Sequence, residues 1–571
     1  MTDDPTEGVT RGGGQPPSPP DPPPQAGPPA PEQQEDTTSS FVRNTVVMST
    51  GTALSRLTGF LRLSAMAYAL GITETRLADA YNVANITPNI LYELALGGIL
   101  TSVVVPVVVE WMQSRGRDAA WDVVRRLFTI ALVVLSVIAV LGIVLAPWIV
   151  DLYTVGYPDV QREAVHGLAT FFLRWFMPQV VFYGIGAVAA GLLNAHRRFA
   201  APMFAPIANN VIVIATFLTF AAMPGVAPGS HELATGAQQL VLAIGTTLGV
   251  VAMTVALWPS VRATGFRFRW IGGVRDEAIG RIGRLATWVV VYVVANQLGY
   301  LIVLILAGGI TGGYSAYAAA FILFQLPHAI FAVSILTALL PAMSSRWAAG
   351  DVDGYRALLS QGIRATATIL IPASLGYLVL ARPIVRLLIE HGETLPASAD
   401  LVAEVLFAFA IGLFAFSAFQ LLLRASYAMQ DTRTPALVNV AAVSVNVAVN
   451  LLFFLVWDLG IPGLALGHAM SYVFASSALL LLIRRRIGRI GGRRILASLG
   501  RILVAGLATA AVAWLVAEGF ELWLGTTTLA AQTVQVLGAV VAGLAVFIAS
   551  AAALRIEEVG LVRRQVSARW R

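Results

Sequence analysis

The chain has 571 residues, of which 57% are hydrophobic and only 12% are charged, and its formal net charge is +7. Soluble proteins average about 25% charged residues, whereas apolar runs of about eighteen residues or more recur here from about residue 41 to the C-terminus. This composition excludes an ordinary soluble enzyme and indicates an all-α, polytopic membrane protein. The chain has no cysteine, which excludes disulfides, thiolate metal sites and cysteine nucleophiles.

The first 40 residues are Pro-rich, include "GGGQPPSPPDPPPQAGPPAPEQQED", and contain almost no large apolar side chains. Such a segment buries too little surface to offset its ordering entropy, so we expect residues 1–40 to be a disordered tail. A polyproline docking site for a partner is the alternative to a plain solvated tail. The apolar run behind the tail lacks a short h-region and a small-residue cleavage site, so we expect it to be a retained helix.

From residue 42 onward, the apolar runs predict about fourteen transmembrane helices. An even number of spans places both ends of the chain on the same side of the membrane. The predicted spans are 42–70, 78–112, 119–149, 164–195, 202–222, 237–260, 280–307, 314–342, 356–381, 399–429, 435–456, 460–483, 495–517 and 529–554.

The distribution of arginine identifies that side. One set of loops is rich in arginine, including "RRRIGRIGGRR" at 484–494, and the tail 555–571 is also basic, whereas alternate loops such as "EHGETLPASAD" at 390–400 are acidic or neutral. Arginine collects on cytoplasmic loops, so both termini are predicted to be cytoplasmic. The same rule explains the positive net charge. No basic face interleaved with aromatic residues is present, and we expect no nucleic-acid partner.

Three short motifs recur at a nearly constant offset of 233 to 236 residues. Six predicted helices separate the copies, so both copies share one orientation, as in transporters with a binding site between two lobes. We therefore predict two six-helix parallel repeats, an N-terminal lobe at 41–263 and a C-terminal lobe at 264–484, followed by two additional helices within 485–554. The matching motifs are "ILTSVVVP" at 99–106 with "ILTALLP" at 335–341, "VLAPWIVDL" at 144–152 with "VLARPIVRL" at 379–387, and "AHRRFAAP" at 195–202 with "AMQDTRTP" at 428–435.

Three ionisable residues fall near mid-membrane depth in the first two predicted spans. Arg56 and Arg62 lie in the first span, and Glu93 lies in the second. A charge at the centre of a membrane helix costs about 2.5–3.5 kcal/mol on insertion scales, so these residues require a role. One interpretation is an Arg–Glu pair that locks two helices together. The other is a polar, water-filled cavity whose net positive charge suits an anionic substrate.

Other polar residues carry weaker signals. Arg174 and Arg424 can face a lumen, whereas Arg364 is expected to extend its side chain toward the membrane interface. His328 and His468 lack metal-ligand spacing, and we expect no metal. No P-loop is present, so the sequence gives no support for ATP hydrolysis by this chain.

Three stretches carry a resemblance to a known family: "SRLTGFLR" at 55–62, "DAYNVANITPNILYELALGGILTSVVVPVVVE" at 79–110 and "FQLPHAIFAVSILTALLPAMS" at 324–344. They resemble the MurJ (MviN) lipid II flippases of the multidrug/oligosaccharidyl-lipid/polysaccharide exporter superfamily. The resemblance covers about residues 41–560. It implies two lobes around a cationic cavity for the lipid II headgroup, and a groove on the last two helices for the polyprenyl tail. It also implies a bacterial cytoplasmic membrane.

The resemblance assigns roles to individual residues. Arg56 and Arg62 match the family's essential arginines of the first helix, and Asp79 matches its acidic residue at the outer end of the second. The predicted substrate-binding residues are Arg56, Arg62, Asp79, Asn89, Tyr92, Glu93 and Arg174. The predicted hinge or close-packing residues are Pro88, Gly97, Gly98 and Pro327.

The chain departs from the family at three positions. Leu63 stands where an acidic residue often follows the second arginine, and Tyr92 and Ile322 stand where arginine is expected. The cavity is therefore expected to be less cationic than in other members. Either Arg174 or Arg424 helps to hold the diphosphate, or the substrate differs.

The leading hypothesis is translocation of an undecaprenyl-diphosphate-linked peptidoglycan precursor by alternating access. No cofactor is expected, and the membrane potential or an ion gradient would drive transport. One alternative is export of another polyprenyl-linked glycan or of drugs. Others are a non-transporting scaffold that recruits cell-wall synthesis proteins through the tail, and a polytopic glycosyltransferase. Expected partners are lipid II or a similar glycolipid, and membrane lipids.

Overall fold

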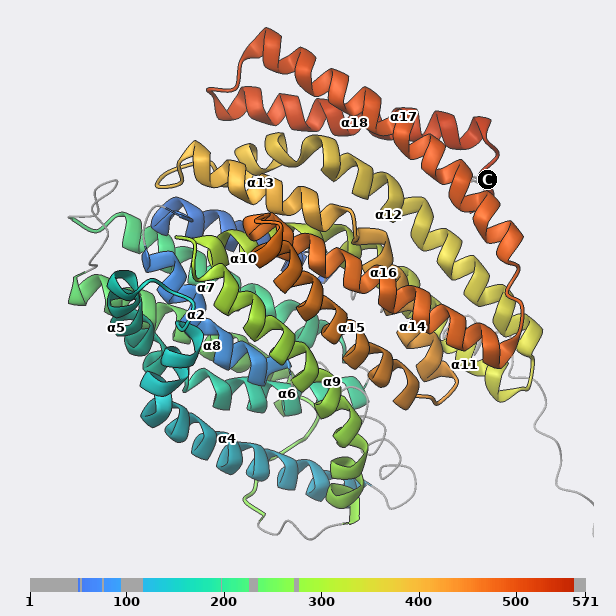
Figure 1. Cartoon of the computed structure of the whole chain (residues 1–571). Helices are drawn as coiled ribbons and strands as arrows, with labels where there is room; N and C mark the ends of the chain where they lie inside the picture. The colour runs from blue at the N-terminus through green and yellow to red at the C-terminus, as the bar shows by residue number, and fades with distance from the viewer. Residues whose placement is uncertain are drawn as a thin grey trace, which may run out of the picture. The chain divides into compact units, whose positions relative to one another are not determined.

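The computed structural model describes residues 50–51, 54–73, 76–93, 117–196, 198–224, 235–271 and 277–558. Every regular element in these ranges is a helix (Figure 1). Residues 54–70 form the first long one. The next are α2 (Arg76–Glu93), α4 (Arg117–Tyr153), α5 (Asp159–Phe176), α6 (Gln179–Ala195), α7 (Ala200–Ala221), α8 (Gly236–Arg262) and α9 (Glu277–Ala307). Then follow α10 (Gly313–Pro327), η2 (His328–Ala332), α11 (Val333–Ala348), α12 (Val352–Ile389), α13 (Pro396–Ala410), α14 (Leu413–Ala428), α15 (Arg433–Leu451), η3 (Leu452–Val456), α16 (Gly460–Ile487), α17 (Gly492–Leu524) and α18 (Leu529–Ala553).

The helices confirm an all-α membrane protein. Within the described ranges, ten helices are long and apolar enough to cross a membrane, and eleven if the bent pair α13–α14 counts as one span. Residues 42–49 and 94–116, parts of the first two predicted spans, lie outside the described residues, as do the tails 1–40 and 559–571. The count of fourteen spans and the lobe boundaries therefore stay predictions.

Three predicted continuous helices are interrupted. The span 164–195 breaks at Met177 and Pro178 between α5 and α6, and 399–429 bends by 50° between α13 and α14. The span 314–342 contains the π-helical turn η2 directly after Pro327. Proline lacks an N–H and leaves the carbonyl four residues earlier without its helical donor. Here the hydroxyl of Tyr377, from α12, donates to that Leu323 carbonyl at 2.8 Å, so a tertiary contact satisfies the interruption.

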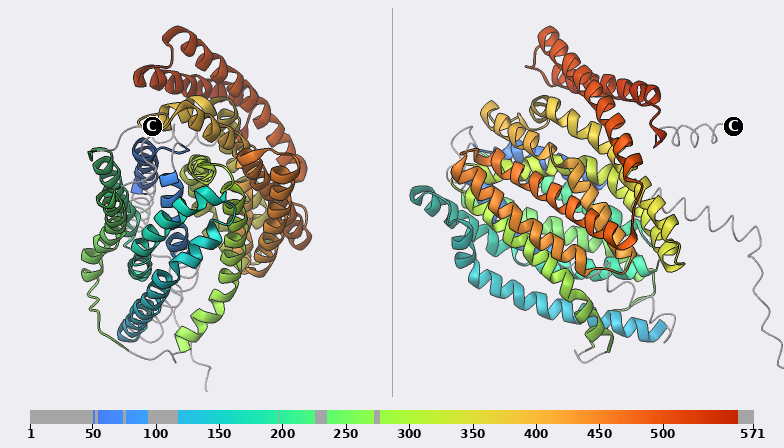
Figure 2. Two further views of the ribbon diagram at one scale, coloured as in Figure 1. Left: turned by 60° about the vertical axis from the view of Figure 1, so that its left-hand side comes forward. Right: turned by 45° about the vertical axis from the view of Figure 1, so that its right-hand side comes forward.

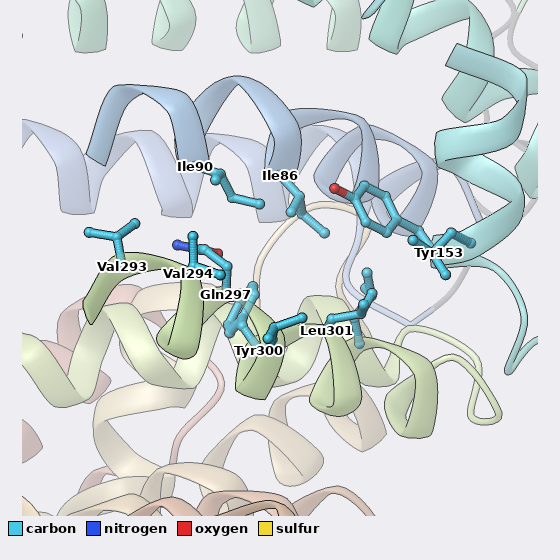
Figure 3. A pocket seen from close by; sticks show the side chains of 11 residues that line it. Ile86, Ile90, Tyr153, Val293, Val294, Gln297, Tyr300 and Leu301 are labelled. Atoms are coloured by element: carbon cyan, nitrogen blue, oxygen red, sulfur yellow. The ribbon is translucent and has the colours of Figure 1, made fainter. Parts of the chain in front are cut away.

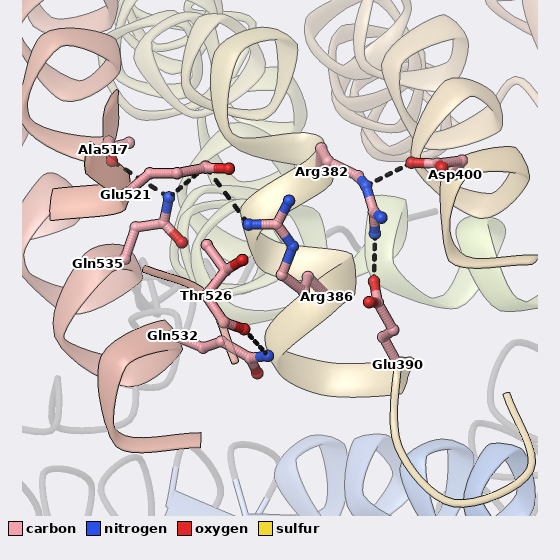
Figure 4. A network of polar contacts seen from close by, with 9 residues as sticks. All are labelled: Arg382, Arg386, Glu390, Asp400, Ala517, Glu521, Thr526, Gln532 and Gln535. Carbon is pink, nitrogen blue, oxygen red and sulfur yellow. Dashed lines mark hydrogen bonds and ion pairs between the residues drawn. The ribbon is translucent and has the colours of Figure 1, made fainter. Parts of the chain in front are cut away.

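The C-terminal hairpin of α17 and α18 packs along α12, as the views of Figures 1 and 2 both show. At one end, Arg386 of α12 pairs with Glu521 of α17 at 3.3 Å, and Gln535 of α18 donates to the same carboxylate at 3.0 Å (Figure 4). Nearby, Arg382 pairs with both Glu390 and Asp400. These contacts join the three helices at the predicted outer side.

The other end of the hairpin is held by a second ion-pair group. Arg364 of α12 pairs with Glu558 at 2.7 Å and with Glu557 at 3.2 Å, both just beyond α18. Arg494, at the start of α17, pairs with Glu557 at 2.5 Å. The side chains of Arg364 and Glu558 are only 10% and 8% exposed. The expectation that Arg364 extends to the interface is therefore wrong, because acidic partners from a distant segment bury it instead.

Aromatic packing fixes the position of α2. The ring of Tyr81 lies edge-on against Phe172 and Phe176 of α5 and Phe217 of α7, with centroids 5.4 to 5.9 Å apart. Its hydroxyl hydrogen-bonds Thr246 of α8 at 2.9 Å. Edge-to-face pairs add to the burial of apolar area. The helix that carries several predicted site residues is thus held by three neighbours.

Candidate functional site

The helix 54–70 carries both predicted arginines and is fixed to α7 by Asn210. The side-chain amide of Asn210 donates to the Ser55 carbonyl at 3.2 Å and to the Thr58 hydroxyl at 3.0 Å. Arg56 is exposed and Arg62 is partly exposed. This polar anchor holds the first turns of the helix while leaving both guanidinium groups accessible.

Arg56 belongs to a group of basic side chains from three helical segments. The charges of Arg424, from α14, and Arg56 both act on the ring of His328, the first residue of η2. The His328 Nδ1 atom hydrogen-bonds the Ser417 hydroxyl at 2.9 Å, which fixes the ring. We call Arg56, His328 and Arg424 the basic cluster. It joins Arg56 to residues that are more than 250 positions farther along the sequence.

Arg62 lies beside tyrosines rather than in this cluster. Its charge acts on the hydroxyl groups of Tyr81 and Tyr183. The rings of Tyr183 and Tyr92 lie 4.4 Å apart at a tilt of 46°. The predicted site residues Arg62 and Tyr92 are therefore connected through Tyr183.

The three arginines have no acidic partner within the part of the chain that the structure describes: no carboxylate there forms an ion pair with Arg56, Arg62 or Arg424. Guanidinium groups bind phosphate oxygens through paired hydrogen bonds. Cations without carboxylate partners in a membrane-spanning region are suited to hold an anionic ligand.

The remaining predicted residues take different places. Asn89 is exposed on α2, and Pro88 is buried in that helix. Arg174 is exposed on α5, and no described contact links it to the basic cluster. Pro327 lies at the junction of α10 and η2. The side chain of Glu93 and the residues Gly97 and Gly98 lie outside the described part, so their roles stay predictions.

Asp79 joins α2 to the start of α10. Its carboxylate accepts hydrogen bonds from the Gly312 N–H at 3.0 Å, the Ser315 N–H at 3.3 Å and the Ser315 hydroxyl at 2.7 Å. The Arg76 guanidinium donates to the same carboxylate at 3.2 Å and to Thr311 at 3.0 Å. The carboxylate thus caps the N-terminus of a helix from the other predicted repeat. We call these five residues the α2–α10 contact.

Close backbone approaches surround the α2–α10 contact. Gly312 has φ +65°, a conformation that favours glycine, and a Cβ there would overlap Ile72 and Thr73. A Cβ at Gly156, between α4 and α5, would overlap the carbonyl oxygen of Ile305 in α9. Farther along, the Thr394 hydroxyl, after α12, donates to the Ala67 carbonyl at 3.0 Å. Helices of the two predicted repeats therefore meet closely at the predicted outer side.

The sequence analysis missed the partners of Asp79. The segment "GGITGG" at 308–313 directly precedes the start of α10, and glycine followed by a helix start is a turn and capping signal. The internal repeat of the sequence could have pointed to these partners. Arg76 and Thr311 are 235 positions apart, and Asp79 is 233 and 236 positions from Gly312 and Ser315, which are the offsets of the repeated motifs.

Curated proteins similar in sequence carry consistent names. The chain is 28% identical over 539 residues to the probable lipid II flippase MurJ of Rhizobium meliloti, with 92% of this chain and 96% of the relative covered. It is also 28% identical over 446 residues to the lipid II flippase MurJ of Burkholderia cenocepacia, covering 78% of this chain and 84% of the relative.

Solved structures share the fold. A lipid II flippase MurJ in an inward closed conformation superposes with a TM-score of 0.69 at 17% identity, covering 89% of this chain and 98% of that structure. An inward-facing multidrug resistance MATE family transporter of the MOP superfamily gives a TM-score of 0.62 at 14% identity, covering 77% and 99%. The sequence model of the family described as lipid II flippase MurJ matches residues 66–534. This match covers most of the length of an all-helical membrane protein. The chain therefore belongs to the lipid II flippase MurJ family.

Proposed function

We propose that this protein translocates lipid II, an undecaprenyl-diphosphate-linked peptidoglycan precursor, from the inner to the outer leaflet of a bacterial cytoplasmic membrane. The observation that carries the proposal is that Arg56, Arg62 and Arg424 form no ion pair with a carboxylate among the residues that the structure describes, in a membrane-spanning protein of this family. The diphosphate is the anionic part of the substrate, and these cations offer it paired hydrogen bonds. Both termini are then cytoplasmic, as the arginine-rich loops predict.

The basic cluster replaces the arginine that the family usually carries before "LFQLP". Ile322 occupies that position, one turn and a half before His328. Arg424, from α14, supplies a cation from a different helix, close enough for its charge to act on His328. In our proposal Arg56 and Arg424 bind the diphosphate together. Arg62, beside Tyr81 and Tyr183, binds it at a second position along the path.

Alternating access gives the α2–α10 contact its role. In the state described here, Asp79 and Arg76 of α2 hold α10, and Gly156 lies against Ile305. We propose that this contact closes the outer side while the basic cluster takes substrate from the inner leaflet. It would then break when the substrate leaves outward. No covalent bond forms or breaks in this cycle, so the protein acts as a transporter and not as an enzyme.

The membrane potential is the proposed driver. An inside-negative potential favours outward movement of an anion by about 2.3 kcal/mol per charge per 100 mV. The diphosphate carries the charge, so neither ATP nor a resident cofactor is needed. An ion gradient is the alternative source of energy.

Complementation tests the proposal. A cell depleted of its own lipid II flippase is supplied with the wild type, Arg56→Ala, Arg62→Ala or Arg346→Ala at matched membrane expression. We expect rescue by the wild type and by Arg346→Ala, whose side chain is exposed on α11, and failure of the other two. Arg56→Lys should rescue only in part, because lysine keeps the charge but loses the planar fork. Rescue by both Arg56→Ala and Arg62→Ala would refute the site.

A second substrate has one observation in its favour. Tyr92 and Ile322 stand where related proteins often carry arginine, so this cavity can suit a different polyprenyl-linked glycan. Well-expressed wild-type protein that fails to rescue the depleted cell, but restores export of another lipid-linked glycan, would select this alternative.

A further inference from the structure

An apolar cavity of about 230 Å³ lies between α2, α4 and α9 (Figure 3). Figure 3 shows Ile86 and Ile90 of α2 facing Val294 and Leu301 of α9 across it. Eight of its eleven lining residues are aliphatic and none is charged. The cavity is separate from the basic cluster, because none of Arg56, His328 and Arg424 lines it.

The polar groups at this cavity have partners elsewhere. The Tyr153 hydroxyl hydrogen-bonds Thr87 at 2.9 Å, and the Tyr300 hydroxyl hydrogen-bonds Tyr314 at 3.0 Å. Gln297, the one amide in the lining, also has a partner. A buried water needs two to four polar partners, and apolar cavities of roughly 150 Å³ stay dry and bind small hydrocarbons instead. The lining therefore favours hydrocarbon over water.

The mouth of the cavity is lined by exposed aliphatic side chains. Leu152, Val294 and Leu298 line it and are 49%, 49% and 59% exposed. In a helix bundle that spans a membrane, exposed aliphatic side chains of this kind contact acyl chains. Ile86, in contrast, lines the same cavity and is only 6% exposed. A lipid chain reaches Ile86 only by entering the cavity.

We propose that this cavity is a binding site for one acyl chain of a membrane phospholipid, inserted between α2 and α9. The surrounding bilayer supplies that occupant at high local concentration, and an empty apolar space beside it forfeits dispersion contacts. The acyl chain separates α2 and α9 at the cavity, while the close approach of Gly156 to Ile305 holds the turn after α4 against α9 nearby. The effect of the bound acyl chain rests on the proposed alternating access: it stabilises the state in which the outer side is closed.

Photolabelling in vesicles tests the site directly. The purified protein is placed in phosphatidylethanolamine and phosphatidylglycerol vesicles that contain a phospholipid with a diazirine along its acyl chain. After illumination, labelled residues are mapped by mass spectrometry. We expect label at Ile86 and Ile90 in addition to Leu298, since the first two report an inserted chain and the last reports any surrounding lipid.

Two cavity-filling variants and one control complete the experiment. Leu301→Trp inside the cavity and Val294→Trp at its mouth should each lower labelling of Ile86 several-fold and leave Leu298 labelled. Val140→Trp, at a position of α4 whose side chain is 60% exposed, should leave the labelling pattern unchanged. Wild-type protein labelled at Leu298 but not at Ile86, or Ile86 labelling unaffected by both variants, would overturn the proposal.

A competition arm separates the two hydrocarbon sources. Displacement of the Ile86 label by undecaprenyl phosphate, but not by an equal amount of unlabelled phospholipid, would assign the cavity to the substrate's tail and overturn the phospholipid assignment. Labelling does not require transport. If Ile86 is not labelled but complementation succeeds, the acyl-chain site is rejected and the flippase proposal stands. If Ile86 is labelled but complementation fails, the flippase proposal is rejected and the acyl-chain site stands.

Discussion

At the scale of single residues, the carboxylate of Asp79 shows why an acid is needed at the end of α2. Its two oxygens accept hydrogen bonds from three donors at the start of α10 and one from Arg76. A carboxylate is acceptor-only on both oxygens, whereas an amide presents a donor on one side. Hydrogen bonds to a charged group contribute about 1.5–3 kcal/mol each.

Asp79→Asn should therefore loosen the α2–α10 contact. The NH2 group of the asparagine amide would face N–H or hydroxyl donors instead of accepting from them. A loss of about 1.4 kcal/mol from the contact would shift the equilibrium between its closed and open forms tenfold. The chain has no native cysteine, so Ala316→Cys, at a fully buried position of α10, provides a clean reporter. We expect a membrane-impermeant maleimide to label it about tenfold faster in the Asp79→Asn background.

A graded control uses Asn82, which donates a single neutral hydrogen bond to the Ser315 hydroxyl at 3.0 Å. Asn82→Ala should raise labelling by less, at most about fivefold, because one neutral hydrogen bond is worth about 1 kcal/mol. Equal labelling rates in wild type and Asp79→Asn would show that the carboxylate does not hold this contact closed.

Some residues of the site were predictable from the sequence and others were not. Arg56 and Arg62 stand out because a charge within an apolar run is costly, whereas the family resemblance singled out Asp79. The charges of Arg424 and Arg56 both act on His328 only in the folded molecule, and no local pattern in the sequence encodes this arrangement. Arg174 has the same residue type and a similar apolar setting, yet no described contact brings it to the cluster.

At the scale of helices, the turn between α4 and α5 contacts α9 through backbone atoms at Gly156. Gly156→Ala should push this turn away from Ile305, because a Cβ would overlap its carbonyl oxygen. Overpacking costs typically about 1–3 kcal/mol. We expect a lower unfolding temperature and faster maleimide labelling of Ala316→Cys. Gly167→Ala is the matched control, since nothing lies within 4 Å of a Cβ at that position of α5, and an unchanged Gly156→Ala protein would contradict the close approach.

The hairpin α17–α18 depends on the buried pair of Arg364 and Glu558. Arg364→Ala leaves Glu558 buried without its cation, which costs about 3–5 kcal/mol. Arg494→Ala removes a pair whose arginine is 64% exposed, which costs about 1 kcal/mol or less. Thermal unfolding in nanodiscs should show this order. The double variant Arg364→Leu with Glu558→Leu should recover much of the loss, and equal losses from both single arginine variants would contradict burial as the cause.

The same end of the hairpin should also respond to pH. Hydrogen bonds from Arg494 and Arg364 hold the pKa of Glu557 below its usual range. A carboxyl group whose pKa is lowered by folding stabilises the folded state above its unfolded pKa, and this contribution disappears as the pH falls through the lowered value. Hairpin stability should therefore be constant near neutral pH and decline on acidification. In Arg494→Ala the decline should be smaller, because the folded pKa of Glu557 then lies closer to its unfolded value, and a series of unfolding temperatures would measure this.

Helix positions were predictable, and helix interruptions were not. Long apolar runs place the predicted spans on helices wherever the structure describes them, apart from the breaks within spans and turn residues at some span ends. The break after Pro327 is stable because Tyr377, from another helix, bonds the freed Leu323 carbonyl. Such a partner is a property of the packed molecule, and proline alone does not distinguish a break from a kink.

At the scale of the whole molecule, the proposed driving force gives a further prediction. Collapse of the membrane potential in cells that depend on this protein should slow lipid II translocation, because the field no longer moves the anion outward. Translocation is followed by the accessibility of lipid II to an external enzyme, at constant ion gradients. An unchanged rate would reject the potential as the driver and favour an ion gradient.

The scaffold alternative assigns the function to the Pro-rich tail, residues 1–40, instead of to the membrane-spanning part. Deletion of residues 1–40 should leave complementation intact if the membrane part transports substrate. If the protein only recruits cell-wall enzymes through its Pro-rich tail, this deletion should abolish complementation while Arg56→Ala is tolerated. Expression is matched by membrane blotting in both arms.

In the proposed cycle, the α2–α10 contact also sets how long an unloaded protein waits before its outer side opens. Four hydrogen bonds hold Asp79, and the loss of any two of them, at about 2 kcal/mol each for a charged acceptor, removes about 4 kcal/mol. A barrier raised by that amount slows spontaneous opening about a thousandfold. An empty carrier that opened freely would pass water and ions between the two faces of a charged membrane. The buried carboxylate of Asp79 would thus limit leakage, and we expect its loss to be measured as an ion conductance of the unloaded protein.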